Sequence, residues 1–317
     1  MPPDSEHDPF PVRHVTRVEE RLNHAWLVEP LCTLRAAIVI GGTPKTCKTW
    51  LGCELALAVA TGAPALGRFA VPHPGTVLFY GAEDSQPTLR ARFEGIARAR
   101  GLSLEGIPLY LLDVTALRID RADHLARLRA TIAEQRPVLV VLDPFVRLTR
   151  VDENSAAEVS AVLGDLRAIQ RELETTILLA HHARKSPSGH KGYQLRGSSD
   201  FAAWHDSALY LSGCPDDLDL HVEHRSAPAP DPLHMRLIKS ADPHLAIVNG
   251  EAVPERAPED ALEAAILERL TAAHRPLSSS ELRDLLRARK QSVTDALARL
   301  ARAGRVRRCD DGWVLAP

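Results

Sequence analysis

Residues 42 to 49 read Gly-Thr-Pro-Lys-Thr-Cys-Lys-Thr, a glycine-led turn that ends in a lysine and a threonine. This spacing matches the phosphate-binding loop G-x-x-x-x-G-K-[ST], except that Cys47 stands where the second glycine is expected. Backbone N–H groups, the N-terminus of the following helix and a lysine ammonium together bind phosphate in such a loop. The residues predicted to contact phosphate are therefore Gly42, Thr43, Pro44, Lys45, Thr46, Cys47, Lys48 and Thr49.

The flanking sequence supplies the two elements that this loop needs. Residues 36–40 form a short run rich in β-branched side chains, which predicts a strand, and residues 49–58 have the apolar spacing of a helix. In this context Lys48 would place its charge on the phosphates, and Thr49 would hold Mg²⁺ through its hydroxyl. With Cys47 in the loop, the pattern alone is also compatible with a chance glycine-rich turn, so later segments must decide.

The composition leaves room for one α/β domain and a small second module, because the chain has 317 residues. Its formal net charge of −2 gives no overall attraction to nucleic acid, so DNA contacts would come from local basic patches. The five cysteines form no CxxC pair, which indicates reduced thiols in a cytosol. We therefore expect a cytoplasmic protein of bacterial type, with no signal peptide and no membrane segment.

Strands and helices alternate through the first 180 or so residues, which is the pattern that builds a mostly parallel sheet. Shorter strands follow without intervening helices, and we expect them as antiparallel additions at the far edge of the sheet. Further strands are predicted at residues 75–80, 108–112, 138–142, 176–180, 208–211, 219–224 and 235–239, and helices at 86–100, 122–135 and 155–173. The predicted organisation is a disordered tail at 1–24, an α/β domain at 25–250, a linker at 251–258 and a small domain at 259–317.

The small C-terminal domain is predicted to be a winged helix. A helix over about residues 260–273 precedes Ser278-Ser279-Ser280-Glu281, a capping box that starts a second helix. A third helix follows Gln291 and stops at Gly304, and two strands flank the turn signal Asp310-Asp311-Gly312. Three helices and a terminal hairpin are the element order of a winged helix.

Acidic residues follow two of the predicted strands, where they would face a bound nucleotide. Asp143 ends the most apolar strand, the place of a Mg²⁺-binding carboxylate in nucleotide hydrolases; the alternative is an aspartate that caps the turn before Pro144. Glu83 and Asp84 follow the strand that ends at Tyr80, at the sheet edge where α/β proteins bind ligands. Glu83 is the candidate base that orients the attacking water, unless both acids only cap the helix that starts near residue 86.

The fifth strand ends in two histidines, and a basic segment follows them. Because this strand ends on the same sheet edge as Lys48, Glu83 and Asp143, His181 is a candidate sensor of the terminal phosphate. Residues 184–199 are rich in glycine, serine, lysine and arginine, which is typical of an exposed loop and also of a segment that contacts a phosphate backbone. The candidate DNA contacts in this segment are Arg184, Lys185 and Lys191.

Over about residues 26–247 these segments resemble the RepA-like AAA ATPases, RecA-fold proteins similar to a hexameric replicative helicase. The resemblance rests on linked motifs in their expected order: Gly42 to Thr49, Tyr80-Gly81-Ala82-Glu83-Asp84-Ser85 with Arg90 downstream, Leu142-Asp143-Pro144, Asp152-Glu153-Asn154, His181-His182-Ala183-Arg184-Lys185 and Arg196-Gly197-Ser198-Ser199. It implies a RecA-like P-loop core that binds ATP and Mg²⁺. The residues to which it gives roles are Lys48, Thr49, Glu83 as base, Asp143 as metal-binding acid and His181 as sensor.

The same resemblance implies that Arg196 is an arginine finger that acts on the nucleotide of a neighbouring subunit. A finger of this kind requires a homo-oligomeric ring or filament; the alternative is a surface cation in an exposed loop. Cys47 departs from the family pattern, because a side chain disfavours a backbone shape that glycine accepts, and this predicts slow hydrolysis or weak binding. A thiol at a helix N-terminus beside Lys48 would also be acidified and open to oxidation.

The predicted winged helix carries many cations on its turn, third helix and wing, which is the footprint expected of a DNA-binding module. Acidic residues are interspersed, and winged helices also dock proteins, so both interpretations stay open. The candidate DNA contacts are Arg289, Lys290, Arg299, Arg302, Arg307 and Arg308.

The leading functional hypothesis is an ATP-driven, oligomeric DNA helicase or remodeller that acts in replication, mobile-element maintenance or repair. It would contact single-stranded DNA through loops of the core and duplex DNA through the winged helix. The alternative is a nucleotide-gated DNA-binding regulator with slow or no turnover, which Cys47 favours. A catalytically inactive scaffold is a third hypothesis, and the set of Lys48, Glu83, Asp143 and Arg196 argues against it.

Overall fold

A computed structural model describes residues 12, 14–17, 25–152, 155–184, 194–195, 199–248, 258–273, 275–286, 290–302, 304–309 and 312–316. The chain forms two compact units, Met1–Asn249 and Gly250–Pro317. Each unit has its own buried apolar core, and the two are described separately. The predicted linker lies outside the described residues except for Pro258, which begins a helix.

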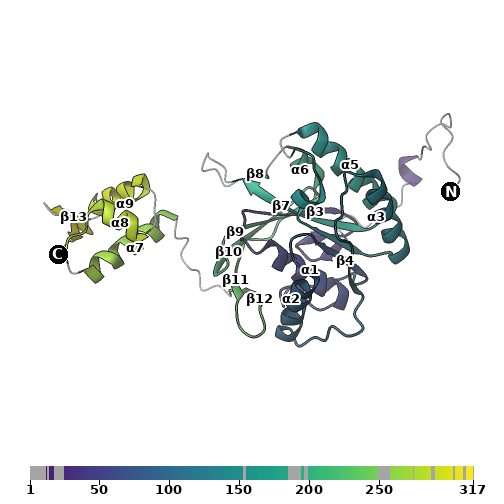
Figure 1. Ribbon diagram of the computed structural model, residues 1–317, viewed down its shortest axis with the longest axis horizontal. Coiled ribbons are helices and arrows are strands. Elements are labelled where there is room, and N and C mark those ends of the chain that lie inside the picture. The colour runs from purple at the N-terminus through teal and green to yellow at the C-terminus, as the bar shows by residue number, and fades with distance from the viewer. Residues whose placement is uncertain are drawn as a thin grey trace. The chain divides into compact units, whose positions relative to one another are not determined.

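A central sheet organises the first unit, and its strands lie in the order β12-β11-β10-β9-β3-β7-β6-β4-β5 (Figure 1). The five strands predicted to be parallel, β3, β7, β6, β4 and β5, are parallel. In chain order, the strands of this unit are β1 (Trp26–Val28), β2 (Cys32–Thr33), β3 (Ala37–Gly42), β4 (Val77–Gly81), β5 (Leu109–Leu111), β6 (Leu139–Asp143), β7 (Thr176–Arg184), β8 (Gln194–Leu195), β9 (Ser207–Cys214), β10 (Asp217–His224), β11 (Leu233–Ile238) and β12 (His244–Ile247).

The far edge of the sheet differs from the prediction in two ways. β9 was expected as an antiparallel strand, but it pairs in parallel with β3, where Ile40 is opposite Leu209. The antiparallel part therefore starts one strand later, with β10, β11 and β12. The sequence analysis missed β12, and a contact across the fold secures this short strand, because the Leu245 N–H donates to the Glu54 carboxylate at 3.0 Å.

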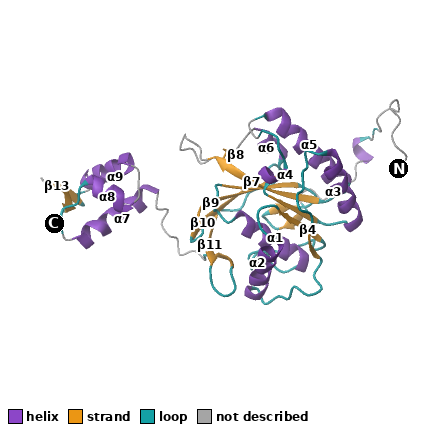
Figure 2. Ribbon diagram, viewed as in Figure 1, coloured by secondary structure: helices purple, strands orange, loops and turns teal. Residues whose placement is uncertain are grey.

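Helices cover both faces of the sheet, as Figures 1 and 2 show. One apolar layer joins the sheet to α1 and α2, and the other joins it to α3, α4, α5 and α6. These strands are buried on both faces, which explains their near-continuous apolar sequences. The helices are α1 (Lys48–Thr61), α2 (Gln86–Ala99), α3 (Ala122–Gln135), α4 (Phe145–Leu148), α5 (Ala156–Glu172) and α6 (Ser199–Trp204), and a 3-10 turn lies at Val15–Arg17.

The second unit consists of three helices and a two-stranded antiparallel sheet. The predicted capping box is present, because the Glu281 N–H donates to Ser278 Oγ at 3.1 Å and the Ser278 N–H donates to Glu281 Oε2 at 2.8 Å. Gly304 has the left-handed φ of 67° that the predicted helix end requires. The elements are α7 (Pro258–Ala273), α8 (Ser279–Leu286), α9 (Lys290–Arg302), β13 (Val306–Cys309) and β14 (Gly312–Leu315).

None of the helices in the described ranges is long and apolar enough to cross a membrane.

Candidate nucleotide-binding site

The predicted phosphate loop runs from the end of β3 to the start of α1. At Gly42 an added Cβ would lie 2.5 Å from Thr46 Oγ1 and 2.7 Å from the Leu211 carbonyl oxygen, so this position needs glycine. The Thr46 hydroxyl donates to the Thr43 carbonyl at 2.8 Å and closes the turn. Together these contacts give the loop a compact shape held by its own residues.

The Lys48 ammonium lies over this loop and is largely buried. It donates to the carbonyl oxygens of Gly42 at 3.0 Å and of Thr43 at 2.9 Å. Burial lowers the pKa of Lys48, whereas the negative charges of Asp143 and Glu83 act in the opposite direction. The lysine is thus held by weak neutral acceptors, which charged phosphate oxygens can replace.

Cys47 adopts the backbone conformation that the missing glycine would take, with φ 61° and ψ 28°. This is the left-handed region, which costs a residue with a side chain more than it costs glycine. The residue precedes α1, and its carbonyl accepts the Leu51 N–H at 3.0 Å, but its side chain makes no capping hydrogen bond. The sequence argument about the backbone of this position is therefore confirmed.

The expectation that the Cys47 thiol is acidified is wrong. The side chain is half-buried and packs against the apolar core, and burial raises the pKa of this thiol to about 11. The positive charges of Lys239 and Arg92 oppose the rise but do not outweigh it. The thiol is accordingly protonated at neutral pH and is a poor nucleophile.

Asp143 ends β6 beside the phosphate loop, and only 5% of it is exposed. Burial raises the pKa of this carboxyl to about 6, while a hydrogen bond with Thr49 and the charge of Lys48 favour its ionised form. An aspartate that only capped the next turn would not need to lie among these residues. The placement therefore favours the metal-binding interpretation over the capping one.

The two acids after β4 have different surroundings. Asp84 accepts from Arg92 at 2.9 Å, and the Arg92 guanidinium lies 5.2 Å from the centre of the Trp50 ring. Neither acid caps α2, because Ser85 does so through its side-chain oxygen, which accepts from the Thr88 N–H. Asp84 is thus committed to a structural ion pair.

Glu83 instead points toward the α4 side of the site, where its Oε1 accepts from Arg147 Nε at 2.9 Å. Sequence reasoning missed Arg147, since a contact between residues 64 positions apart leaves no trace in local spacing. The charge of Glu83 also acts on both Lys48 and Asp143. The fold therefore brings Lys48, Thr49, Glu83 and Asp143 to one edge of the sheet.

A model of the AAA domain family matches residues 3–188, which is more than half of the chain and includes all four of these residues. The chain belongs to the AAA domain family. Among solved structures, a DnaB-like replicative helicase, studied with its primase interactions, aligns with a TM-score of 0.51 and 14% identity over 67% of this chain. The ATPase domain of another protein aligns with a TM-score of 0.50 and 16% identity, over 68% of this chain and 85% of that domain.

These likenesses identify the fold of this AAA domain protein as RecA-like, as the sequence predicted. The chain covers 57% of the length of the DnaB-like helicase, and no curated protein matches the sequence. Arg196 lies beyond the region that the AAA family model matches.

The two histidines at the end of β7 lie on opposite faces of the AAA domain sheet. His181 is fully buried on the α5 side, where its ring stacks on Phe201 at 4.0 Å and meets Phe145 edge-on at 5.7 Å. Strand alternation places His182 on the other face, which α1 covers, and pairs it in register with Gly42. The ring of His181 thus faces the core, and His182 is the better candidate for contact with a phosphate.

The remaining predicted contacts of this AAA domain protein fall into three groups. Arg299 forms an ion pair with Glu263 at 2.6 Å, so its charge is already used within the second unit. Arg307 and Arg308 are exposed on β13. Arg184 ends β7, and Lys290 and Arg302 begin and end α9, with side chains outside the described set. Residues that lie outside the described ranges altogether are Lys185, Lys191, Arg196 and Arg289.

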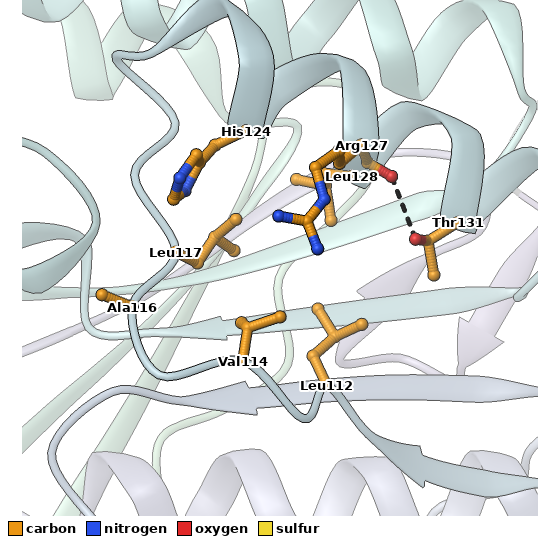
Figure 3. A pocket seen from close by; sticks show the side chains of 8 residues that line it. All are labelled: Leu112, Val114, Ala116, Leu117, His124, Arg127, Leu128 and Thr131. Atoms are coloured by element: carbon orange, nitrogen blue, oxygen red, sulfur yellow. Dashed lines mark hydrogen bonds between the residues drawn. The ribbon is translucent and has the colours of Figure 1, made fainter.

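A separate pocket lies between the segment after β5 and helix α3 (Figure 3). Its lining is mainly apolar, with Arg127 and His124 as its basic members. It has no part of the phosphate loop and no carboxylate, so its chemistry differs from that of the nucleotide site. The lining residues are Leu112, Val114, Ala116, Leu117, His124, Arg127, Leu128 and Thr131.

Proposed function

We propose that this AAA domain protein binds and hydrolyses ATP at the edge of the sheet formed by β3, β6 and β4. The observation that carries the proposal is the convergence of Lys48, Thr49, Glu83 and Asp143, which act on one another through charge and a hydrogen bond although they come from three separate elements. Phosphoryl transfer requires a cation on the phosphates, oxygen donors for Mg²⁺ and a carboxylate beside the attacking water.

Each of the four residues has a place in this chemistry. Lys48 would leave its carbonyl acceptors for the charged phosphates, and Glu83 would orient the attacking water and accept its proton. Thr49 and Asp143 are hard oxygen donors in contact with each other, which fits Mg²⁺. The ion would neutralise charge that develops on the phosphates.

We further propose that the protein works as a homo-oligomeric DNA helicase or remodeller. Arg196 follows the histidine strand, from which a finger would reach the nucleotide of the next subunit. The second unit has the element order of a winged helix, and Arg307 and Arg308 on its hairpin present two exposed cations to a phosphate backbone.

The direct test is an ATPase assay with and without single-stranded DNA, combined with sizing in the presence of ATP. Hydrolysis should rise with DNA and disappear in Lys48→Ala and in Glu83→Gln, of which only the first should also weaken nucleotide binding. Equal rates in wild type and Glu83→Gln would disprove the assignment of the base. Hydrolysis that ignores DNA, without strand separation, would rule out the motor.

A second candidate function is a DNA-binding regulator that ATP controls and that turns over slowly. The left-handed Cys47 favours it, because a strained phosphate loop is more easily reconciled with a switch than with a fast motor. In that case Arg307→Glu together with Arg308→Glu abolishes duplex binding, whereas Arg269→Glu, on the exposed surface of α7, does not. Full duplex affinity in the double variant would eliminate this function.

A further inference from the structure

Helix α4 is a single turn that starts two residues after Asp143, and its Arg147 contacts the candidate base. Arg147 Nε donates to Glu83 Oε1 at 2.9 Å, and the two side chains are 62% and 47% exposed. Neither the phosphate loop nor the metal-binding acid explains this ion pair. Its position beside the attacking water, as proposed above, raises the question of what it does to Glu83.

The two ends of this ion pair belong to well-anchored backbone. On α4, Phe145 and Leu148 are fully buried, and the Leu148 carbonyl accepts from the Ile119 N–H at 2.8 Å. The Arg118 guanidinium donates to the carbonyl oxygen of Arg147 itself. Arg147 therefore projects from a fixed backbone, and only its side chain needs to move to break the ion pair.

The ion pair and the proposed chemistry compete for the same carboxylate. A base that orients water must offer an oxygen lone pair to that water, whereas Glu83 gives its Oε1 to a guanidinium. An exposed ion pair of this kind is weak, so it can bias the carboxylate without locking it. A stronger acceptor near Arg147 would free Glu83.

A phosphate backbone is such an acceptor, and the exposure of this segment suits it. Arg147 and the neighbouring Arg150 are both exposed cations, and guanidinium groups bind phosphate oxygens in preference to weaker acceptors. We propose that Arg147 is a positioning residue that withholds Glu83 in the DNA-free protein, and that a single-stranded DNA backbone releases Glu83 by competing for the Arg147 guanidinium. This inference rests on the proposed ATPase function.

The test compares ATP hydrolysis by full-length wild type, Arg147→Gln and Arg147→Lys, each with and without poly(dT). Arg147→Gln should raise the DNA-free kcat about 1.5-fold to fivefold, the range that an exposed ion pair supplies, with KM for ATP unchanged. Its stimulation by poly(dT) should shrink by the same factor. Arg147→Lys, which keeps the charge, should behave more like wild type.

Arg129→Gln is the matched control, because Arg129 and Glu172 form an ion pair of similar exposure, 56% and 46%, away from the site. It should leave both rates unchanged, and melting temperatures should be alike in the two glutamine variants. A lower kcat or a higher KM in Arg147→Gln would assign Arg147 to catalysis or nucleotide binding and overturn the inference. An unchanged DNA-free rate would overturn it as well.

A second measurement separates this inference from the ATPase proposal. If wild type does not hydrolyse ATP, the proposed function fails, and a double-mutant cycle of Arg147→Gln and Glu83→Gln in nucleotide-free unfolding then decides whether the two residues interact. Coupling that poly(dT) removes supports the competition between Glu83 and phosphate. Additive effects show that the ion pair is not formed and overturn the inference.

Discussion

Replacement of Cys47 by glycine separates the backbone effect of this position from the effect of its side chain. The left-handed backbone of Cys47 costs a residue with a Cβ about 1–2 kcal/mol. Glycine removes this cost but returns about 0.4–1 kcal/mol through the greater freedom of the unfolded chain. The lost burial of a half-buried group the size of a methylene costs about 0.5–1 kcal/mol.

These terms nearly cancel for Cys47→Gly, so its free energy of unfolding should stay within about 1 kcal/mol of wild type. Cys47→Ala loses the buried sulfur and keeps the left-handed cost, so it should be less stable than wild type by about 0.5–1 kcal/mol. The glycine variant should therefore be more stable than the alanine variant. Urea unfolding of the three proteins, followed by circular dichroism, gives the comparison.

Nucleotide binding gives an independent reading of the same pair of variants. If the Cβ of residue 47 crowds the phosphates, Cys47→Gly should bind a fluorescent ATP analogue more tightly and turn over faster, while Cys47→Ala should resemble wild type. An alanine variant as stable as the glycine variant would refute the strain argument. Equal ATP affinities in all three proteins would show that the departure from the family pattern does not affect the ligand.

Three further predictions follow from the geometry of the site. Gly42→Ala should lower the free energy of unfolding by about 1–3 kcal/mol, since its Cβ would lie 2.5 Å from a side-chain oxygen and 2.7 Å from a backbone oxygen; an unchanged urea midpoint would contradict this. Because the pKa of Asp143 is raised to about 6, the Mg²⁺ concentration for half-maximal hydrolysis should rise about tenfold per pH unit below that value, and a requirement independent of pH between 5 and 7 would exclude Asp143 as a ligand. Iodoacetamide should modify the exposed Cys214 before the half-buried Cys47, whose thiol has a pKa of about 11, as peptide mass mapping over time can decide.

Local signals in the sequence predicted most of the elements that carry the site. Helix α3 has the predicted bounds, and the capping box of α8 is formed, because both depend on side chains a few residues apart. The convergence of Lys48 and Asp143 at one edge followed from the parallel sheet, in which strand ends meet. Topology that is fixed by alternation is thus readable from the chain alone.

The features that the sequence could not predict depend on partners far apart in the chain. The strand β9 joins β3 in parallel because of a pairing between residues about 170 positions apart, and β12 depends on the carboxylate of Glu54 in α1. Which of His181 and His182 faces the phosphate loop depends on strand register, and a shift of one residue exchanges the two faces. The contact of Arg147 with Glu83 is of the same long-range kind.

Helix α4 gives the two parts of the proposed mechanism a physical connection. Its Phe145 ring meets Phe201 of α6 edge-on at 5.0 Å and also contacts His181, while its Arg147 holds Glu83. Because buried rings are close-packed, a displacement of α6 must be taken up by the side chains that touch it. The predicted finger Arg196 precedes α6 by only a few residues in the chain. A nucleotide of the neighbouring subunit that acts on that segment would therefore alter α4 and the restraint on Glu83, which couples two ATP sites of the proposed ring through one aromatic contact.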